Sequence, residues 1–364
     1  MRTGFTTGAC AQGGVRACVD ALLTGRWEPS VQVKLPNGKI TRFTLHSFRF
    51  DPINPTEATV SIIKDGGDDP DCTHGAEIVT TVRLTSDGAI RFSSGPGVGT
   101  MTKPGLAIPV GEPAINPVPR EFMSREFRES LGRIREKYHW DNPGIMITVS
   151  VPDGEERSKK TLNARLGIVG GLSILGTKGI VVPFSTAAYR ASITQAIEVA
   201  CAQDIKTVVM TTGGQSEAFA AKIHPELPPE SFIQIGDFTG YSIRQAARIG
   251  IEHVILAGFL GKFSKLAKGV TQTHAAGSQV DLDFLVGLAR ETGASEEVCE
   301  KIRTANTARH VGEIIEESGN RDFFGLLCEN IICHIGKIKP RPQVIEVLLT
   351  NFKGEQVGYA RKQE

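Results

Sequence analysis

Three segments decide the fold: Thr207-Val-Val-Met-Thr-Thr212, Ser231-Phe-Ile-Gln-Ile235 and His253-Val-Ile-Leu-Ala257. Each is a short run of apolar and β-branched residues, which is typical of a strand buried on both faces of a sheet. Helical patterns over Ser216–Ile223 and Tyr241–Ile249 separate them. Strands that alternate with helices along the chain predict a parallel sheet built from βαβ units.

The same alternation extends to both sides of these strands. Further strands are expected at 145–151, 179–182 and 344–350, and a helix with Ser185 as its N-cap is expected to run through Cys201. Residues after Asp281 have mostly helical patterns. We therefore expect residues 141–364 to form an α/β cofactor-binding domain with a mainly parallel, Rossmann-like sheet and a helical C-terminal region.

The first 140 residues have a different pattern, in which strands and helices are joined by long loops rich in glycine, aspartate and proline. A helix is expected after the Thr6–Gly8 turn, and Pro36-Asn37-Gly38 joins two alternating runs into a hairpin. Further strands are expected at 58–63 and 76–84, and a helix at 121–139 that ends before Asn142-Pro143-Gly144. Residues 1–140 are expected to form an α+β domain whose loops bind the substrate.

Composition limits the class of protein. The chain has 364 residues, with 41 Lys and Arg against 40 Asp and Glu, and it is 40% hydrophobic. Such a chain can bury a core, and its charge balance argues against a nucleic-acid or polybasic membrane binder. Seven cysteines without paired spacing, no apolar run of ~20 residues and no signal-peptide pattern predict a soluble cytoplasmic protein. It is expected to bind neither nucleic acid nor membrane, and homo-oligomers are possible.

Glycine turns follow all three deciding strands. In an open parallel sheet, ligands bind beyond the carboxyl ends of the strands, and an acidic residue there can accept hydrogen bonds from a ribose diol. An adenosine-containing cofactor fits this edge, and the candidate residues that would bind it are Thr212, Gly213, Gly214, Gly236, Asp237 and Gly258. The alternative interpretation is that these are ordinary loop glycines and that Asp237 caps the helix near Gly240.

Named phosphate-binding motifs are absent from the sequence. Gly171–Lys178 has the length of a P-loop but lacks its Gly-Lys-Ser/Thr ending, and Gly261-Lys262 is followed by Phe263. Gly95–Thr100 lacks the third spaced glycine of a dinucleotide-binding motif. An NTPase is therefore excluded.

The loop Lys64–Gly75 carries four aspartates, a cysteine and a histidine. Asp68, Asp69 and His74 are the candidate catalytic residues, because such a loop could position a proton donor or bind a cation. The loop lacks EF-hand spacing, and aspartates also occupy turns because their side chains bond nearby backbone N–H groups. Cys328 and Cys333-His334 have no matching pair at zinc spacing, so no protein metal site is expected.

Cationic residues gather in loops that contain glycine or proline. Those that could bind a ligand with several carboxylates or phosphates include Lys103, Arg120, Lys262 and Lys265. A solvated surface is the simpler interpretation for most of them.

Long ordered motifs of this chain resemble the cobalt-precorrin-5B C(1)-methyltransferase family, CbiD. They include Gly4-Phe-Thr-Thr-Gly-Ala-Cys10, Asp65-Gly-Gly-Asp-Asp-Pro-Asp-Cys-Thr-His-Gly75, the run from Gly97 to Arg120, Asn163–Gly179 and Gly236-Asp-Phe-Thr-Gly240. The resemblance covers nearly the whole chain and adds Thr6 and Thr7 to the candidate substrate-binding residues.

The resemblance implies methyl transfer from S-adenosylmethionine to cobalt-precorrin-5B, giving cobalt-precorrin-6A in the oxygen-independent branch of cobalamin biosynthesis. It implies that cobalt is carried by the substrate, a polycarboxylate tetrapyrrole, and not by the protein. Two other functions stay open at this point. A nicotinamide-dependent reductase would use the same sheet edge, and a tetrapyrrole carrier would bind the macrocycle without releasing S-adenosylhomocysteine.

Overall fold

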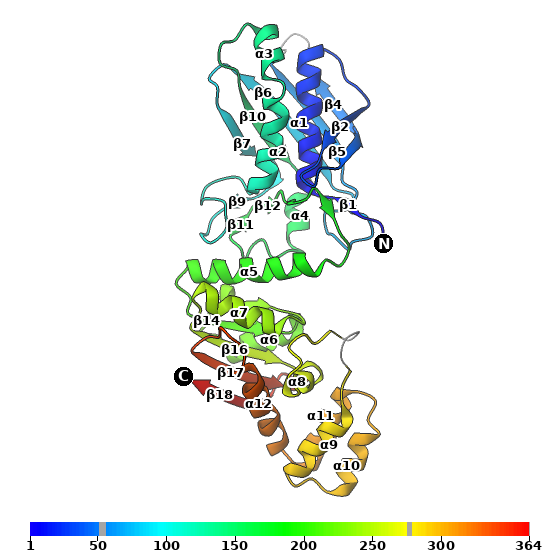
Figure 1. The fold of residues 1–364 in the computed structure, drawn as a ribbon, viewed down its shortest axis with the longest axis vertical. Helices are drawn as coiled ribbons and strands as arrows, with labels where there is room; N and C mark the ends of the chain where they lie inside the picture. The colour runs from blue at the N-terminus through cyan, green and yellow to red at the C-terminus, as the bar shows by residue number, and fades with distance from the viewer. Residues whose placement is uncertain (51–55, 275–278, 364) are drawn as a thin grey trace. The chain divides into compact units, whose positions relative to one another are not determined.

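The computed structural model describes residues 1–50, 56–274 and 279–363. The chain divides into two compact units, Met1–Ser185 and Thr186–Glu364, here called the N-terminal and C-terminal units (Figure 1). The boundary expected at residue 140 is therefore too early. Strand β10 (Gly144–Ser150) was expected in the second domain, but it pairs with β6 (Glu77–Thr85) and β7 (Ile90–Ser94) of the N-terminal unit.

The N-terminal unit is an α+β structure around a five-stranded sheet of order β4-β5-β6-β10-β7. Only the β10–β7 pair of this sheet is parallel. The other elements of the unit are β1 (Gly4–Phe5), α1 (Thr7–Thr24), β2 (Ser30–Lys34), β3 (Ile40–Thr44), β4 (Ser47–Phe50), β5 (Glu57–Ile63), β8 (Gly97–Val98), β9 (Thr100–Met101), α2 (Pro117–Arg128), α3 (Leu131–Tyr138), α4 (Gly154–Ser158), β11 (Ile168–Val169), β12 (Gly171–Leu172) and β13 (Ile180–Val181).

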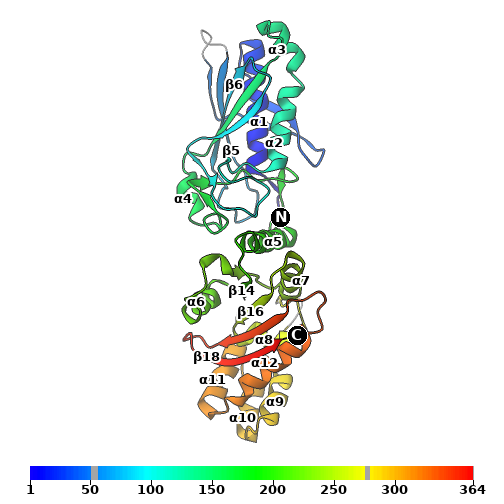
Figure 2. The same ribbon diagram turned by 90° about the vertical axis from the view of Figure 1, so that its left-hand side faces the viewer.

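Helix α1 is the central helix of this unit and lies against the sheet, with α2 beside it (Figure 2). It begins where Thr6 Oγ1 accepts the N–H of Ala9 at 3.1 Å and ends at Gly25, whose φ of 72° suits a left-handed C-cap. The start of this helix agrees with the sequence prediction, as does the β2–β3 hairpin. The single helix expected at 121–139 is instead two helices, α2 and α3, interrupted at Glu129 and Ser130.

Short two-stranded sheets join the loops at one end of the N-terminal unit: β1–β13, β8–β12 and β9–β11. These pairings require close backbone approach. A Cβ on Gly97 would lie 1.8 Å from the carbonyl oxygen of Val151, and its φ is 73°. The glycines of these motifs therefore include positions that the fold itself requires.

The C-terminal unit contains the three strands that the sequence analysis began from. Its elements are α5 (Thr186–Ala202), β14 (Thr207–Thr211), α6 (Gly214–Ile223), a 3₁₀ turn (Pro229–Ser231), β15 (Phe232–Gln234), α7 (Thr239–Ile249), β16 (His253–Gly258), α8 (Leu260–Ala267), α9 (Leu282–Glu291), α10 (Glu296–Arg303), α11 (Ala308–Ser318), α12 (Asp322–Ile335), β17 (Val344–Thr350) and β18 (Gln356–Gln363). The helical region after Asp281 and the strand at 344–350 agree with prediction, whereas β18 was not predicted.

The sheet of the C-terminal unit has the order β15-β14-β16-β17-β18. The first four strands are parallel, and β18 runs antiparallel to β17. This order differs from the 3-2-1-4-5-6 order of a dinucleotide-binding fold, so the Rossmann-like part of the prediction is not confirmed. The structure shows two units, each of which combines helices with a central sheet.

Both faces of this sheet are buried, which explains the continuous apolar runs. Val208 and Met210 belong to the core cluster that includes Ile243 of α7. Val209 points the other way and packs in a second cluster with Ala220 of α6. Alternate residues of one strand thus support helices on opposite faces and hold the strand ends in fixed positions.

Candidate functional site

The carboxyl ends of β15, β14 and β16 meet at one edge of the C-terminal sheet. Because β14 lies between β15 and β16, the chain leaves β14 toward one neighbour and returns on its other side. Ligands of open α/β sheets bind at such a reversal of strand order. A cleft of about 800 Å³ opens at this edge, within the size range of ligand sites.

The cleft contains most of the predicted cofactor residues and two of the predicted substrate residues. Its lining includes Thr212, Gly213, Gly214, Asp237, Lys262 and Lys265. Gly236 and Gly258 do not line the cleft, but each directly precedes a lining residue, Asp237 or Phe259. The sheet thus brings together predicted residues from three separate segments of the chain.

Asp237 is held by two protein groups through one oxygen. Its Oδ1 lies 3.1 Å from Lys262 Nζ and accepts the Thr273 hydroxyl at 2.9 Å. In the part of the chain that the structure describes, its Oδ2 has no partner. Burial acts to raise the pKa of Asp237, but the hydrogen bond and charge of Lys262 outweigh it, so the pKa lies below the ordinary carboxyl value. Asp237 is therefore a fixed, ionised carboxylate, and its Oδ2 can accept hydrogen bonds from a ligand.

The two lysines of the cleft have structural partners. Lys262 Nζ also donates to the carbonyl oxygen of Thr212 at 3.0 Å, so it connects the ends of β14 and β15. Lys265 is 9% exposed and donates to the carbonyl oxygen of Thr273 at 3.0 Å. These contacts fix the walls of the cleft and set its charge, whereas the sequence marks both lysines only as candidates for binding a ligand with several carboxylates or phosphates.

The four predicted glycines fall into two kinds. Gly236 has a φ of 56°, and a Cβ on Gly258 would lie 2.5 Å from the Phe263 ring, so the fold requires both. Gly213 has extended backbone, and a Cβ there would meet no atom within 4 Å. A Cβ on Gly214 would make only an ordinary contact, 3.7 Å from Gln234. The fold therefore gives no reason for glycine at 213 and 214.

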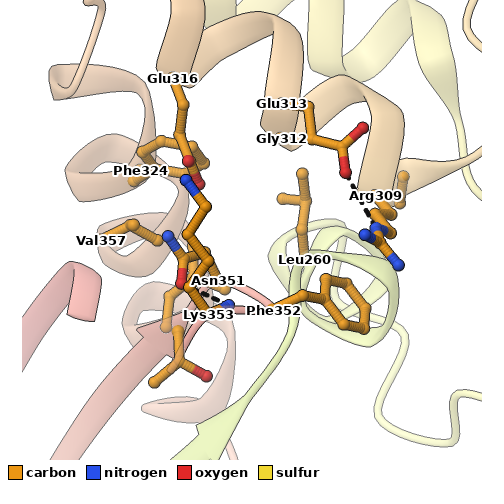
Figure 3. Close-up of a pocket in the computed structure, with 13 residues that line it drawn as sticks. Leu260, Arg309, Gly312, Glu313, Glu316, Phe324, Asn351, Phe352, Lys353 and Val357 are labelled. Atoms are coloured by element: carbon orange, nitrogen blue, oxygen red, sulfur yellow. Dashed lines mark hydrogen bonds and ion pairs between the residues drawn. The ribbon is translucent and has the colours of Figure 1, made fainter. Parts of the chain in front are cut away.

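An aromatic stack forms another wall of the cleft. The rings of Phe259 and Phe352 are parallel, with centroids 4.5 Å apart, and the Arg309 guanidinium lies 4.8 Å from the Phe352 centroid. Arg309 is also bonded to Glu313. Behind Phe352 and Arg309 lies a smaller, largely apolar cavity of about 80 Å³, lined on its other side by Phe324 and Val357 (Figure 3). Phe352 and Arg309 line both spaces and so form the boundary between them.

Several lining residues were not predicted. They include Gln215, Ser216, Phe259, His274, Asn306, Thr307, Arg309 and Phe352. The strand that precedes Phe352 was predicted, but only the structure shows that it runs parallel to β16, so that its carboxyl end lies at the same edge as the others. Thr307 had a recognisable signal as the N-cap of α11, where its hydroxyl accepts the N–H of His310.

The predicted catalytic residues lie on the loop between β5 and β6 of the N-terminal unit. His74 Nδ1 accepts the N–H of Gly66 at 3.0 Å, and its side chain is 55% exposed. Asp68 accepts the backbone N–H of Arg2 at 2.6 Å, and Asp69 accepts that of Phe184 at 3.0 Å. The two aspartates thus join neighbouring segments, whereas His74 presents most of its ring to solvent.

The remaining predicted substrate residues of this unit are largely engaged in the fold. Thr6 caps α1, and Thr7 Oγ1 exchanges hydrogen bonds with the backbone of Leu175. Arg120 donates to the carbonyl oxygens of Ile115 and Pro113 and to Glu112. Lys103 is half-buried.

The described ranges contain neither a candidate membrane-spanning helix nor a candidate metal cluster. No helix in them is long and apolar enough to span a bilayer. Within the same ranges, no cluster of three or more His, Cys, Asp or Glu side chains could hold a metal ion.

Comparison with known proteins covers both units. Residues 1–183 match the family described as CbiD, and residues 272–361 match the one described as CbiD, C-terminal domain. Cobalt-precorrin-5B C(1)-methyltransferase of Geobacillus kaustophilus (strain HTA426) is 49% identical over 329 residues, which are 90% of this chain and 86% of that protein. The protein of the same name from Priestia megaterium is 47% identical over 362 residues, 99% and 96% of the two chains.

A solved structure also matches, the crystal structure of cobalamin biosynthesis protein (cbiD) from Archaeoglobus fulgidus. It is 24% identical, with a TM-score of 0.37, and the match covers 88% of this chain and 85% of that one. The family matches and the identities of 49% and 47% over nearly the whole length agree with each other. This chain belongs to the CbiD family.

Proposed function

We propose that this protein transfers a methyl group from S-adenosylmethionine to C(1) of cobalt-precorrin-5B, giving cobalt-precorrin-6A in cobalamin biosynthesis. The reaction is the one for which its curated relatives are named. The observation that carries our placement of the donor is the cleft at the switch point of the C-terminal sheet, with Asp237 fixed at its wall. The nicotinamide-dependent reductase considered above has no support among these relatives.

The groups of the cleft fit this donor. Asp237 Oδ2 is placed to accept hydrogen bonds from the ribose diol. Gly213 and Gly214 leave open the space that side chains would fill, so a ligand can approach the backbone at the start of α6. The rings of Phe259 and Phe352 offer an apolar surface for the purine.

The chemistry requires little covalent help from the protein. The bound donor supplies a methyl group on a sulfonium sulfur, which is already an electrophile, and the electron pair of the broken S–C bond stays on sulfur. The work of the protein is to hold two reactants in line and to exclude water, and well-oriented reactants gain roughly 7–11 kcal/mol over free collision. The braced strand ends around Lys262 supply such rigidity on the donor side.

We place the macrocycle at the loop end of the N-terminal unit, where His74 is exposed and where Lys103 stays a candidate because its positive charge suits a carboxylate. Arg120, Thr6 and Thr7 are engaged in the fold, so we assign them to shaping the loops. Lys262 and Lys265 are assigned to the donor cleft instead of the substrate.

Replacing Asp237 by alanine is expected to weaken binding of S-adenosylmethionine by about 10- to 100-fold, because a hydrogen bond to a charged group contributes roughly 1.5–3 kcal/mol. Titration calorimetry of the full chain measures this change. Asp283→Ala, an exposed aspartate on α9, is the matched control and should bind as the unmodified protein does. If the Asp237 variant and the control bind S-adenosylmethionine equally well, the methyl donor does not bind in this cleft. Binding of NADH in place of S-adenosylmethionine would favour the reductase.

Lys262→Met is expected to move the pH dependence of donor binding upward. Lys262 keeps the pKa of Asp237 below the ordinary carboxyl value, so in the unmodified protein the carboxylate stays ionised until the pH falls below that value. Without Lys262, the Thr273 hydroxyl and the charge of His274 still lower the pKa of Asp237, but burial is opposed less, so the pKa rises and affinity should begin to fall at a higher pH. Affinities measured from pH 4 to pH 8 test this. Lys262→Arg keeps the charge and should retain the original profile, and identical profiles for Met and Arg would contradict the role of the ion pair.

A further inference from the structure

His74 has its hydrogen-bonding direction fixed by the backbone. Gly66 donates its N–H to Nδ1 at 3.0 Å, so Nδ1 acts as an acceptor. A neutral imidazole carries one proton, which must then be on Nε2. In the described residues Nε2 has no partner, and the side chain is 55% exposed. The ring therefore presents an N–H donor outward, and its only basic nitrogen is covered by Gly66.

The loop that carries His74 is held by an ion pair between a buried lysine and a half-buried aspartate. Lys64 is 1% exposed, and its Nζ lies 2.5 Å from Asp71 Oδ2. Asp71 Oδ1 in turn accepts the backbone N–H and the hydroxyl of Thr73 at 2.7 and 2.6 Å. The backbone of His74 donates to the carbonyl oxygen of Asp71 at 2.9 Å. Lys64 thus fixes the turn from which the His74 side chain projects.

Arg157 of α4 fixes the same turn from the other side. Its Nη1 donates to the carbonyl oxygens of Cys72 at 2.6 Å and His74 at 3.0 Å, and its Nε donates to Asp153 at 2.6 Å. Gly66 completes the arrangement, because a Cβ there would lie 3.2 Å from His74 Cβ and 3.4 Å from Nδ1. The ring, the turn and the opposing strand end are therefore held together from three directions.

We propose that Lys64 and Arg157 are positioning residues that hold His74 as a fixed hydrogen-bond donor for a carboxylate or carbonyl oxygen of the substrate, and that His74 is not a proton acceptor in the reaction. The proposal rests on the proposed function for the identity of the reaction. It assigns His74 to binding and orienting the macrocycle, which agrees with a methyl transfer whose electron pair leaves on sulfur. A donor held in one direction costs no reorganisation when the substrate binds.

The tautomer of His74 can be measured without substrate. Nitrogen-15 NMR of histidine-labelled protein, with His74 assigned by comparison with the His74→Gln variant, should show Nδ1 unprotonated and Nε2 protonated at neutral pH. A spectrum with the proton on Nδ1 would overturn the proposal. This readout is independent of whether the protein transfers methyl groups, so it fails separately from the proposed function.

Three His74 variants separate a donor from a base in the methyl-transfer assay. The side-chain amide of glutamine places an N–H near the position of Nε2 and cannot take up a proton, so His74→Gln should keep kcat/KM within about tenfold of the unmodified protein. His74→Asn, whose amide is too short to reach, and His74→Leu should each lose about 10- to 100-fold. Equal losses for Gln and Leu would contradict the donor role.

A double-mutant cycle tests the positioning residues. Lys64→Met and Arg157→Met should each lower kcat/KM in the unmodified background but have little further effect in the His74→Leu background, because their action passes through His74. Arg157→Met is the safer variant if loss of the buried Lys64 impairs folding. Lys39→Met, an exposed lysine in the hairpin turn, is the control. Additive losses in the His74→Leu background would show a general structural role and overturn the assignment.

Discussion

Gly213→Leu is expected to lower the affinity for S-adenosylmethionine by at least about 100-fold, or about 2.7 kcal/mol, while the protein stays folded. The backbone at Gly213 is extended and a Cβ there meets no atom within 4 Å, so the leucine can be accommodated. Its side chain would occupy the cleft where we place the donor. Loss of a glycine N-cap costs at most about 1 kcal/mol. Calorimetric titration and thermal unfolding by circular dichroism measure the two effects.

Two other glycines serve as controls for this variant. Gly287→Leu, on the exposed surface of α9 with open space around it, should change neither affinity nor Tm. Gly258→Ala should lower stability by about 1–3 kcal/mol, because its Cβ would be forced against the Phe263 ring. A Gly213→Leu protein that binds the donor normally would show that the open space at the start of α6 belongs to no ligand.

Gly97→Ala is expected to give the largest loss of stability in the N-terminal unit, about 3 kcal/mol or more. The added Cβ would lie 1.8 Å from the Val151 carbonyl oxygen and 2.9 Å from the Gly154 nitrogen, both of which are backbone atoms. The φ of 73° adds strain for any residue with a side chain. A loss of this size corresponds to a fall in Tm of roughly 6–12 °C for a unit of this length.

Tryptophan fluorescence isolates this effect. The two tryptophans of the chain, Trp27 and Trp140, both belong to the N-terminal unit, so their emission follows the unfolding of that unit. Gly132→Ala on α3, where a Cβ meets nothing within 4 Å, is the matched control and should unfold as the unmodified protein does. An unchanged fluorescence transition for Gly97→Ala would mean that the loops at β8 and β12 are not packed as described.

The strands of the C-terminal sheet could be predicted because they are buried on both faces, and such strands have continuous apolar runs in the sequence. Val208, Val209 and Met210 are all buried, two on one face and one on the other, which only a strand covered on both sides allows. Because ligands bind beyond the carboxyl ends of parallel strands, these strands then pointed to Gly213 and Asp237 as site residues. The same rule would have reached Phe352, but nothing in the sequence of β17 says that it runs parallel to β16.

The domain boundary could not be predicted, because the sequence of strand β10 would fit the sheet of either unit. Its run from Ile145 to Val149 is apolar and β-branched, and only its pairing with β6 and β7 assigns it to the N-terminal unit. The hydrogen-bond and ion-pair partners of a side chain also cannot be predicted from the sequence. Lys262 and Arg120 are candidates for substrate binding by residue type, and only the structure shows that each is also bonded within the fold.

The measurement that tests the central claim most directly is transfer of an isotopically labelled methyl group from S-adenosylmethionine to cobalt-precorrin-5B by the purified protein. The account predicts one S-adenosylhomocysteine for each macrocycle that gains the label, and transfer that is strongly reduced by Gly213→Leu and unaffected by Gly287→Leu. Mass spectrometry of the macrocycle and chromatography of the donor give both quantities. Binding of the macrocycle with no label transferred and no S-adenosylhomocysteine formed would contradict the account and favour a tetrapyrrole carrier.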